Sequence, residues 1–181
     1  MKKISLILLM ALIFFSACKK ENDEIPFRSK PELPEDIPID VDNDGEVDFT
    51  FDYYENIYPD PVTPYLMVGS MKTSNGNGIL FKNGFSTLFL EDLSEVKINV
   101  TDPFSWGESR GSFSVSLIEI ESFKDRSKWP LEWNVLSDTQ KSSYLLGVKI
   151  KKTDDSEVLG FIEFSVDKHS GEATILKAEL L

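Results

Sequence analysis

The sequence predicts an all-β protein, an antiparallel β-sandwich of about eight to ten short strands. Three observations predict this fold. From residue 39 onward, several short runs alternate apolar and polar residues with a period of two. Turn signals separate the runs, among them Asn75-Gly76 and His169-Ser170-Gly171. No long stretch shows a convincing helical period of about 3.6 residues.

The strands are justified run by run. In Phe85–Leu93, apolar residues occur at both odd- and even-numbered positions. This pattern is typical of a central strand that is covered on both faces. In Phe113–Ile120 the apolar residues lie at odd-numbered positions up to Leu117 and at even-numbered positions from Ile118 on. Such a change of phase within one strand is typical of a β-bulge. Four runs alternate cleanly, and we expect each to form a half-buried strand: Val96–Val100, Tyr144–Ile150, Ile162–Val166 and Leu176–Leu180.

Residues 1–17 have the pattern of a lipoprotein signal peptide. Two lysines precede the apolar run Ile4–Phe15, which is shorter than the roughly 20 residues of a membrane span. Small residues then precede Cys18, the only cysteine of the chain. This arrangement resembles the lipobox of bacterial lipoproteins, in which the cysteine is diacylated. The alternative is an ordinary signal peptide followed by an unrelated cysteine, and the position of Cys18 favours lipidation.

Two further regions follow the signal peptide. Residues 18–38 contain four prolines and many charges, so we expect a flexible, solvated tether. The alternative is an irregular first strand. Residues 39–181 are expected to form the single β-sandwich domain. Because Cys18 is the only cysteine, this domain forms no internal disulfide.

The chain is acidic, with a formal net charge of −12. Such a surface repels nucleic-acid phosphates and anionic lipids, so we expect no nucleic-acid partner and membrane attachment only through the acyl anchor at Cys18. Acidic residues directly after Cys18 resemble the signal that exports Bacteroidota lipoproteins to the cell exterior. We therefore expect an outer-membrane lipoprotein at the cell surface, with a periplasm-facing position as the alternative.

The segment Ile39–Phe49 crowds aspartates at alternate positions and includes Gly45. Calcium takes six to eight oxygen ligands, and glycine permits the sharp turn that brings such ligands together. The spacing resembles the first nine positions of an EF-hand loop, in which the apolar Val47 would anchor the loop to the core. We therefore expect a structural Ca²⁺ site formed by Asp40, Asp42, Asp44, the backbone carbonyl of Glu46, and Asp48.

The loop departs from an EF-hand in one respect. Its twelfth position is Phe51, where an EF-hand has a bidentate glutamate, and β-prone residues follow. The loop is thus similar to free-standing calcium loops of extracellular modules. The alternative is a hairpin turn at Asn43-Asp44-Gly45 whose aspartates are only solvated.

Two regions together resemble a group of Bacteroidota lipoproteins and secreted β-proteins of unknown activity. Near the start, that group carries an Ile-Asp-x-Asn/Asp-x-Asp-Gly-x-x-Asp-Phe segment, matched by Ile39–Phe49. Near the end, it carries three strands matched by Tyr144–Ile150, Gly160–Val166 and Ala173–Leu180, with Phe161 in place of a tryptophan. The resemblance implies a β-sandwich with a calcium-type loop and implies no activity.

The sequence gives little support for catalysis. The only histidine, His169, lies in a turn signal, so we expect an exposed turn residue and no catalytic base. Glu119 and Glu121 would share one face of a strand, a spacing compatible with a small glycan-active hydrolase that uses paired carboxylates. Solvent-facing glutamates give the same pattern, and we prefer a non-catalytic binding or accessory module.

Three tryptophans are candidate ligand contacts, because they lie in turn-rich segments outside the cleanest strands. Aromatic rings at a sandwich edge can stack on sugar rings or contact an envelope protein. The alternative is that the same side chains cap the hydrophobic core. The candidates are Trp106, Trp129 and Trp133.

Overall fold

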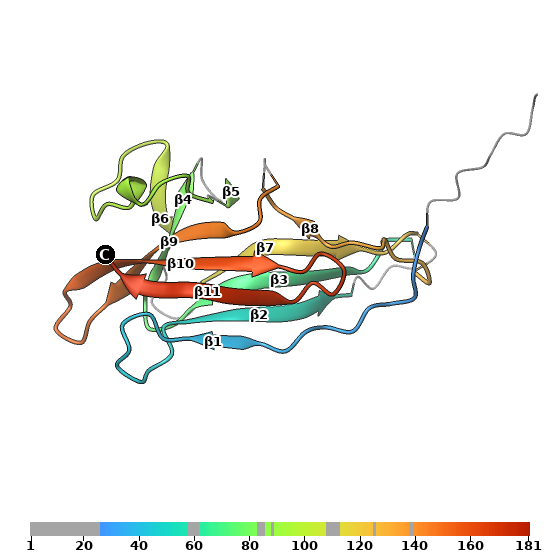
Figure 1. Ribbon diagram of the computed structural model, residues 1–181, viewed down its shortest axis with the longest axis horizontal. Helices are drawn as coiled ribbons and strands as arrows, with labels where there is room; N and C mark the ends of the chain where they lie inside the picture. Colours follow the sequence, from blue (N-terminus) through green and yellow to red (C-terminus); the bar gives the residue numbers. More distant parts are fainter. Residues whose placement is uncertain are drawn as a thin grey trace, which may run out of the picture.

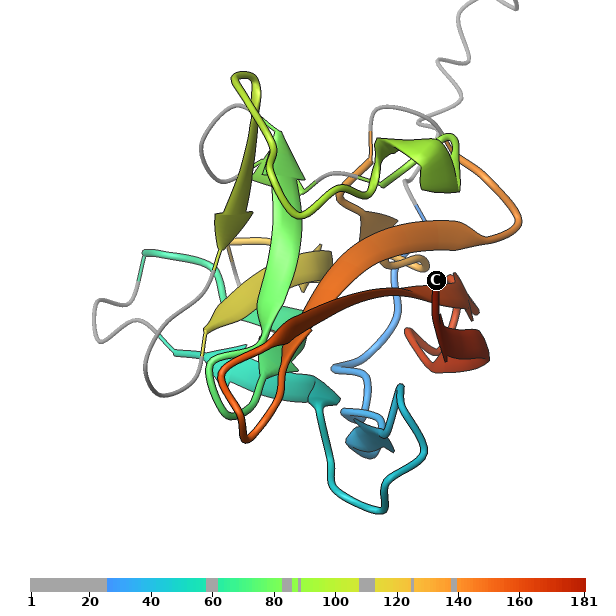
Figure 2. The same cartoon turned by 90° about the vertical axis from the view of Figure 1, so that its left-hand side faces the viewer.

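The computed structural model describes residues 26–57, 62–82, 86–87, 89–107, 113–124, 126–137 and 140–181. In these residues the backbone forms strands and loops, with one short 3₁₀ turn, η1 (Leu93–Glu95). Figures 1 and 2 show two sheets packed face to face, so the predicted all-β sandwich is confirmed. The signal peptide and Cys18 lie outside the described residues.

Each sheet is antiparallel. In spatial order, the strands of the first sheet are β1 (Ile37–Ile39), β2 (Phe49–Asn56), β3 (Leu66–Thr73), β7 (Ser114–Glu121) and β8 (Asn134–Val135). The second sheet contains β11 (Ala173–Leu180), β10 (Glu157–Val166), β9 (Tyr144–Lys151), β4 (Gly78–Lys82) and β5 (Ser86–Thr87), with β6 (Phe104–Gly107) also paired to β4.

The main hydrophobic core fills the space between the two sheets. Aromatic rings from both sheets meet there, because alternate side chains of each strand point inward. Phe51 of β2 contacts Phe164 of β10 edge to face, with ring centroids 5.5 Å apart. Tyr144 of β9 packs on the same Phe164 ring at 5.7 Å. The alternating runs Tyr144–Ile150 and Ile162–Val166 are therefore confirmed as strands.

The predicted turn at Asn75-Gly76 carries the chain from the first sheet to the second. Ser74 accepts a hydrogen bond from the backbone N–H of Asn77 at 2.9 Å, which closes a four-residue turn. Both central residues have positive φ, 53° for Asn75 and 81° for Gly76. This backbone geometry explains the sequence of the turn, because asparagine and glycine tolerate positive φ better than other residues.

The predicted β-bulge is confirmed in β7. Its register against β3 shifts by one residue, because Gly69 pairs with Ile118 while Ser70 pairs with Ser116. Leu117 is therefore the extra residue, and Leu117 and Ile118 are both buried in the core. A parity change inside an apolar run thus marked the bulge at the correct position.

A second bulge lies in β11, where the alternating pattern did not predict one. Glu163 of β10 pairs with Lys177 and Phe164 pairs with Ile175, so Leu176 is the extra residue. The run Leu176–Leu180 is a strand as expected, but Leu176 is exposed instead of facing the core. The bulge is the physical reason, because it changes which side chains face inward.

The run Phe85–Leu93 does not form a central strand. Among its described residues, only Ser86–Thr87 is a strand, and this strand ends the spatial order of the second sheet. Phe89 packs on Tyr144 in the main core at 4.8 Å, whereas Leu90 packs in a second cluster with Leu80 and Val96. Apolar residues occur at both odd and even positions because they pack into two separate hydrophobic clusters. They do not form one strand that is covered on both faces.

The run Val96–Val100 is not a strand either. The Asp92 side chain accepts a hydrogen bond from Ser94 and caps η1, and Val96 ends this turn. Val96 then packs against β9, where a Cβ on Gly147 would lie 3.0 Å from Val96 Cγ2. Val100 is partly buried, but Ile98 is 48% exposed, so the alternation does not correspond to a buried face of a strand.

Residues 28–38, expected to belong to the flexible tether, lie along the sandwich. Arg28 and Trp129 exchange backbone hydrogen bonds of 2.9 and 3.1 Å. Asp36 accepts a hydrogen bond from the backbone N–H of Tyr53 at 2.9 Å, and β1 begins at Ile37. The boundary expected at residue 39 is therefore too late, because backbone pairing attaches the preceding segment to the domain.

Candidate metal centre

The acidic loop, residues 40–48, joins the neighbouring strands β1 and β2. Ile39 and Phe49 face each other in the ladder, and the backbone N–H of Asp48 donates to the Ile39 carbonyl at 2.9 Å. Both ends of the loop are thus fixed by pairing and burial. Val41 anchors the loop to the core, being 1% exposed, whereas Val47, the expected anchor, is 42% exposed. Figure 1 shows the loop at the same end of the sandwich as the β9–β10 hairpin.

Backbone hydrogen bonds fix the aspartates inside the loop. The N–H of Gly45 donates to Asp40 Oδ2 at 2.9 Å, and the N–H of Asp44 donates to Asp42 Oδ1 at 3.2 Å. Gly45 has a φ of 92°, and a Cβ at this position would meet nothing within 4 Å. Glycine is therefore needed here for backbone conformation and not for space. Asp40 and Asp42 thus each use one carboxylate oxygen in a hydrogen bond within the loop.

Three carboxylates converge in this loop. Oxygen atoms of Asp40, Asp42 and Asp48 all lie within 4.8 Å of one another, and Asp48 is buried. Asp48 Oδ2 accepts from the N–H of Val41 at 2.9 Å, and Oδ1 accepts from Nδ2 of Asn77 at 3.2 Å. Burial raises the pKa of Asp48, and the negative charges of Asp40 and Asp44 raise it further. The loop therefore holds more negative charge than its hydrogen bonds compensate.

Within the part of the chain that the structure describes, one ammonium group pairs with the cluster. Lys152, in the β9–β10 turn, forms an ion pair with Asp42 Oδ2, and the Asp42 side chain is only 3% exposed. Asp40 Oδ1 is buried and has no hydrogen-bond partner among the described residues. One positive charge against three carboxylates leaves an excess of negative charge. The Asp40–Asp42–Asp48 cluster can therefore hold a metal ion, and its all-oxygen donors suit a hard divalent cation.

The structure does not bring all the expected ligands together. Asp44 is exposed, and its Oδ1 accepts the N–H of Glu46 at 2.9 Å. The Glu46 side chain is exposed as well, which is compatible with a role for its backbone carbonyl alone. Sequence reasoning missed Asn77 and Lys152, which reach the loop from turns distant in the chain. Their spacing gives no signal, because only the folded sandwich brings them near the aspartates.

The tryptophans differ in exposure. Trp129 is 0% exposed and Trp133 is 2% exposed, and both belong to the main core. The expectation that these two rings contact a ligand is therefore wrong, because they fill the space between the sheets. Trp106 is half-buried, and its Nε1 donates to the carbonyls of Lys97 and Ile98, both at 3.1 Å. A ligand contact at Trp106 stays a prediction.

Glu119 and Glu121 lie two residues apart at the end of β7, opposite Val68 and Leu66 of β3. Burial raises the pKa of Glu119, and the charge of Glu121 raises it further. Neither glutamate lines the two cavities described for this structure. The pair therefore has a carboxyl group of raised pKa that lies outside both of these cavities.

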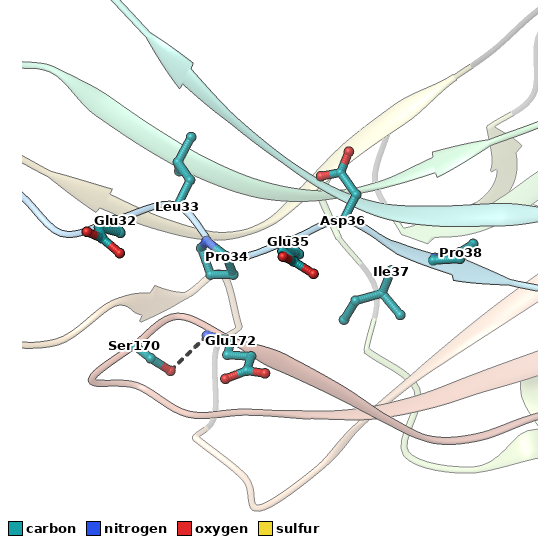
Figure 3. Close-up of a pocket in the computed structure, with 9 residues that line it drawn as sticks. All are labelled: Glu32, Leu33, Pro34, Glu35, Asp36, Ile37, Pro38, Ser170 and Glu172. Atoms are coloured by element: carbon teal, nitrogen blue, oxygen red, sulfur yellow. Dashed lines mark hydrogen bonds between the residues drawn. The ribbon is translucent and has the colours of Figure 1, made fainter.

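The larger of these cavities, about 600 Å³, lies between residues 32–38 and the β10–β11 turn. Figure 3 shows Glu35 and Glu172 near the gap, whereas Asp36 turns away toward β2. With four acidic side chains in its lining and no basic one, this cavity disfavours anionic ligands.

Comparisons of the chain with protein-family models, with curated proteins and with solved structures find no significant match. Within the described residues, no helix combines the length and the hydrophobicity needed to cross a membrane. The class of protein that fold and site define is thus an all-β sandwich with an acidic, metal-compatible loop at one end.

Proposed function

We propose that the acidic loop binds one calcium ion with a structural role. Asp40, Asp42 and Asp48 supply carboxylate oxygens, and the Glu46 carbonyl completes the protein ligands. The single observation that carries this proposal is the buried Asp40 Oδ1, which lacks a partner among the described residues beside two further carboxylates. Calcium favours such oxygen ligands at 2.3–2.6 Å and accepts water for the remaining positions.

The ion would join three segments at one end of the sandwich. Asp48 already contacts the β3–β4 turn, because its carbonyl accepts from the N–H of Ser74 at 2.9 Å. Asp42 already contacts the β9–β10 turn through Lys152. A cation at the centre would strengthen both connections by offsetting the repulsion between carboxylates. At a free calcium concentration ten times the dissociation constant, binding to the folded state adds about 1.4 kcal/mol to the free energy of unfolding.

The wider function proposed is that of a non-catalytic binding or accessory module, lipid-anchored at Cys18 in the cell envelope. The lipobox-like sequence, the acidic composition and the resemblance to Bacteroidota lipoproteins support this proposal. Its partner would be a glycan or another envelope protein. Polysaccharide hydrolysis that is abolished by Glu119→Gln would instead favour the glycan-active alternative, for which the raised pKa of Glu119 is the supporting observation.

Calcium is expected to raise the melting temperature of the full chain by about 3–6 °C over chelator, which corresponds to about 1.4 kcal/mol for a domain of this size. Asp40→Asn should remove this increment. The side-chain oxygen of the asparagine still accepts the hydrogen bond from the N–H of Gly45, whereas its NH₂ group takes the place of the oxygen that would bind calcium. Asp44→Asn is the matched control and should retain most of the increment. Thermal unfolding followed by circular dichroism measures all three proteins.

The Lys152→Met variant separates the two sources of positive charge. Without the ammonium, the buried Asp42 carboxylate loses its ion pair, so stability in chelator should fall by about 1–3 kcal/mol. The calcium increment should then grow, because calcium supplies the positive charge that Lys152 no longer gives to the buried Asp42 carboxylate. Identical melting curves in calcium and in chelator, for wild type and Lys152→Met alike, would refute the metal site.

A further inference from the structure

Strand β11 is an edge strand with an exposed apolar surface. It pairs with β10 on one side, and no described strand pairs with its other side. Leu176 is 53% exposed and Leu180 is 39% exposed. An exposed edge of this kind is a template for pairing with another strand. The question is which strand fits it.

The backbone direction of β11 is set by its pairing with β10. The N–H of Leu181 donates to the carbonyl of Leu159 at 3.0 Å, so residue 181 directs its backbone groups toward β10. Backbone groups alternate in direction along a strand. Leu180 and Ala178 therefore direct their N–H and C=O groups away from β10, to the open edge.

The geometry points to a second copy of β11 as the partner: we propose that two chains pair antiparallel along this edge, about a two-fold axis at Ala178. In this register, Lys177 faces Glu179 of the second copy, and Leu176 faces Leu180 of the second copy. The two-fold axis repeats each contact, so two charge pairs and two apolar pairs form. They form because the segment Leu-Lys-Ala-Glu-Leu (176–180), read antiparallel against itself, places lysine opposite glutamate and leucine opposite leucine. This inference is independent of the metal site.

The charges also exclude the neighbouring registers. A shift of two residues in one direction would place Lys177 opposite its own copy, and a shift in the other direction would place Glu179 opposite its own copy. Like charges directly opposite each other are destabilising in a sheet. A shift of one residue would move each side chain to the other face relative to its partner. Only the register centred on Ala178 satisfies all four side chains.

The two charged residues that test this register lie on the surface. Lys177 and Glu179 form an ion pair within the strand at 2.5 Å, and their side chains are 52% and 46% exposed. We expect Lys177→Glu and Glu179→Lys each to weaken the dimer about tenfold or more, because each change places like charges opposite one another twice. The double variant Lys177→Glu/Glu179→Lys should dimerise as the wild type does, because the exchange restores both pairs.

Mixing the two single variants gives the sharpest test. One chain then carries two glutamates and the other two lysines at these positions, so a heterodimer should form although each variant alone is monomeric. Sedimentation equilibrium of the full chains over a concentration series, in a detergent of matched density, measures these states. Melting curves should differ little among the variants apart from the dimer's contribution, because an exposed ion pair adds little to stability.

Three outcomes would overturn the proposal. The first is a wild-type chain that stays monomeric over the whole concentration series. The second is dimerisation that neither single substitution weakens, since this would place the contact elsewhere in the chain. The third is a mixture of the single variants that remains monomeric, because the proposed register predicts complementary charges in that mixture.

Discussion

Gly171→Ala is expected to lower the free energy of unfolding by about 2–5 kcal/mol, because the added methyl group meets both an unfavourable backbone conformation and a buried ring. Gly171 has a φ of 80°, which costs an alanine about 1–2 kcal/mol. Its Cβ would lie 2.3 Å from Cε2 of Trp133. Trp133 is buried between the sheets, so its ring cannot move aside without disturbing the core.

The turn cannot relieve this contact easily. Gly171 donates its N–H to the carbonyl of Asp167 at 2.7 Å, and its own carbonyl accepts from the Tyr53 hydroxyl at 3.1 Å. Gly45→Ala, measured in chelator, is the matched control, because Gly45 also has positive φ but no atom near its Cβ. Chemical denaturation of both variants isolates the contact with Trp133. Equal losses of stability would show that this contact contributes nothing.

Asp48→Ala is expected to destabilise the protein by about 2–4 kcal/mol even in chelator, or about 4–16 °C in melting temperature. The substitution leaves the buried N–H of Val41 and one contact of Asn77 without an acceptor. Asp48→Asn keeps one of the two acceptors and removes the charge that burial and Asp40 disfavour, so it should cost about half as much. Neither variant should respond to calcium.

Urea unfolding in chelator and in calcium separates the two roles of Asp48. If Asp48→Ala proved as stable as the wild type in chelator, its hydrogen bonds would not hold the loop. If either variant kept the full calcium increment, Asp48 would not be a ligand.

The sequence predicted those features that depend on neighbouring residues. Alternation identified Tyr144–Ile150 and Ile162–Val166, because each of these strands has one face toward the main core. The parity change after Leu117 identified the bulge in β7. Alternation at Val96–Val100 misled, because Val96 packs against β9 whereas Ile98 is 48% exposed, and the run belongs to no described strand. An alternating sequence therefore does not by itself establish either burial or strand pairing.

The sequence predicted the position of the candidate site but not all of its contacts. Aspartate spacing located the loop, because a tight turn brings alternate carboxylates together within nine residues. It did not predict that Asp44 points outward, or that Lys152 and Asn77 reach the cluster from other turns. It also did not predict the burial of Trp129 and Trp133. Each of these depends on contacts between distant segments, which local spacing does not encode.

The measurement that tests the metal site most directly is a calcium titration of the full chain, monitored through the backbone amide resonances of the acidic loop and of Asn77. The account predicts saturable shifts at Val41, Gly45 and Asn77, with one ion bound per chain and a dissociation constant of about 10⁻⁴–10⁻³ M. Asp40→Asn should abolish the shifts, and Asp44→Asn should preserve them. Resonances that stay unchanged at saturating calcium, or that shift equally in Asp40→Asn, would contradict it.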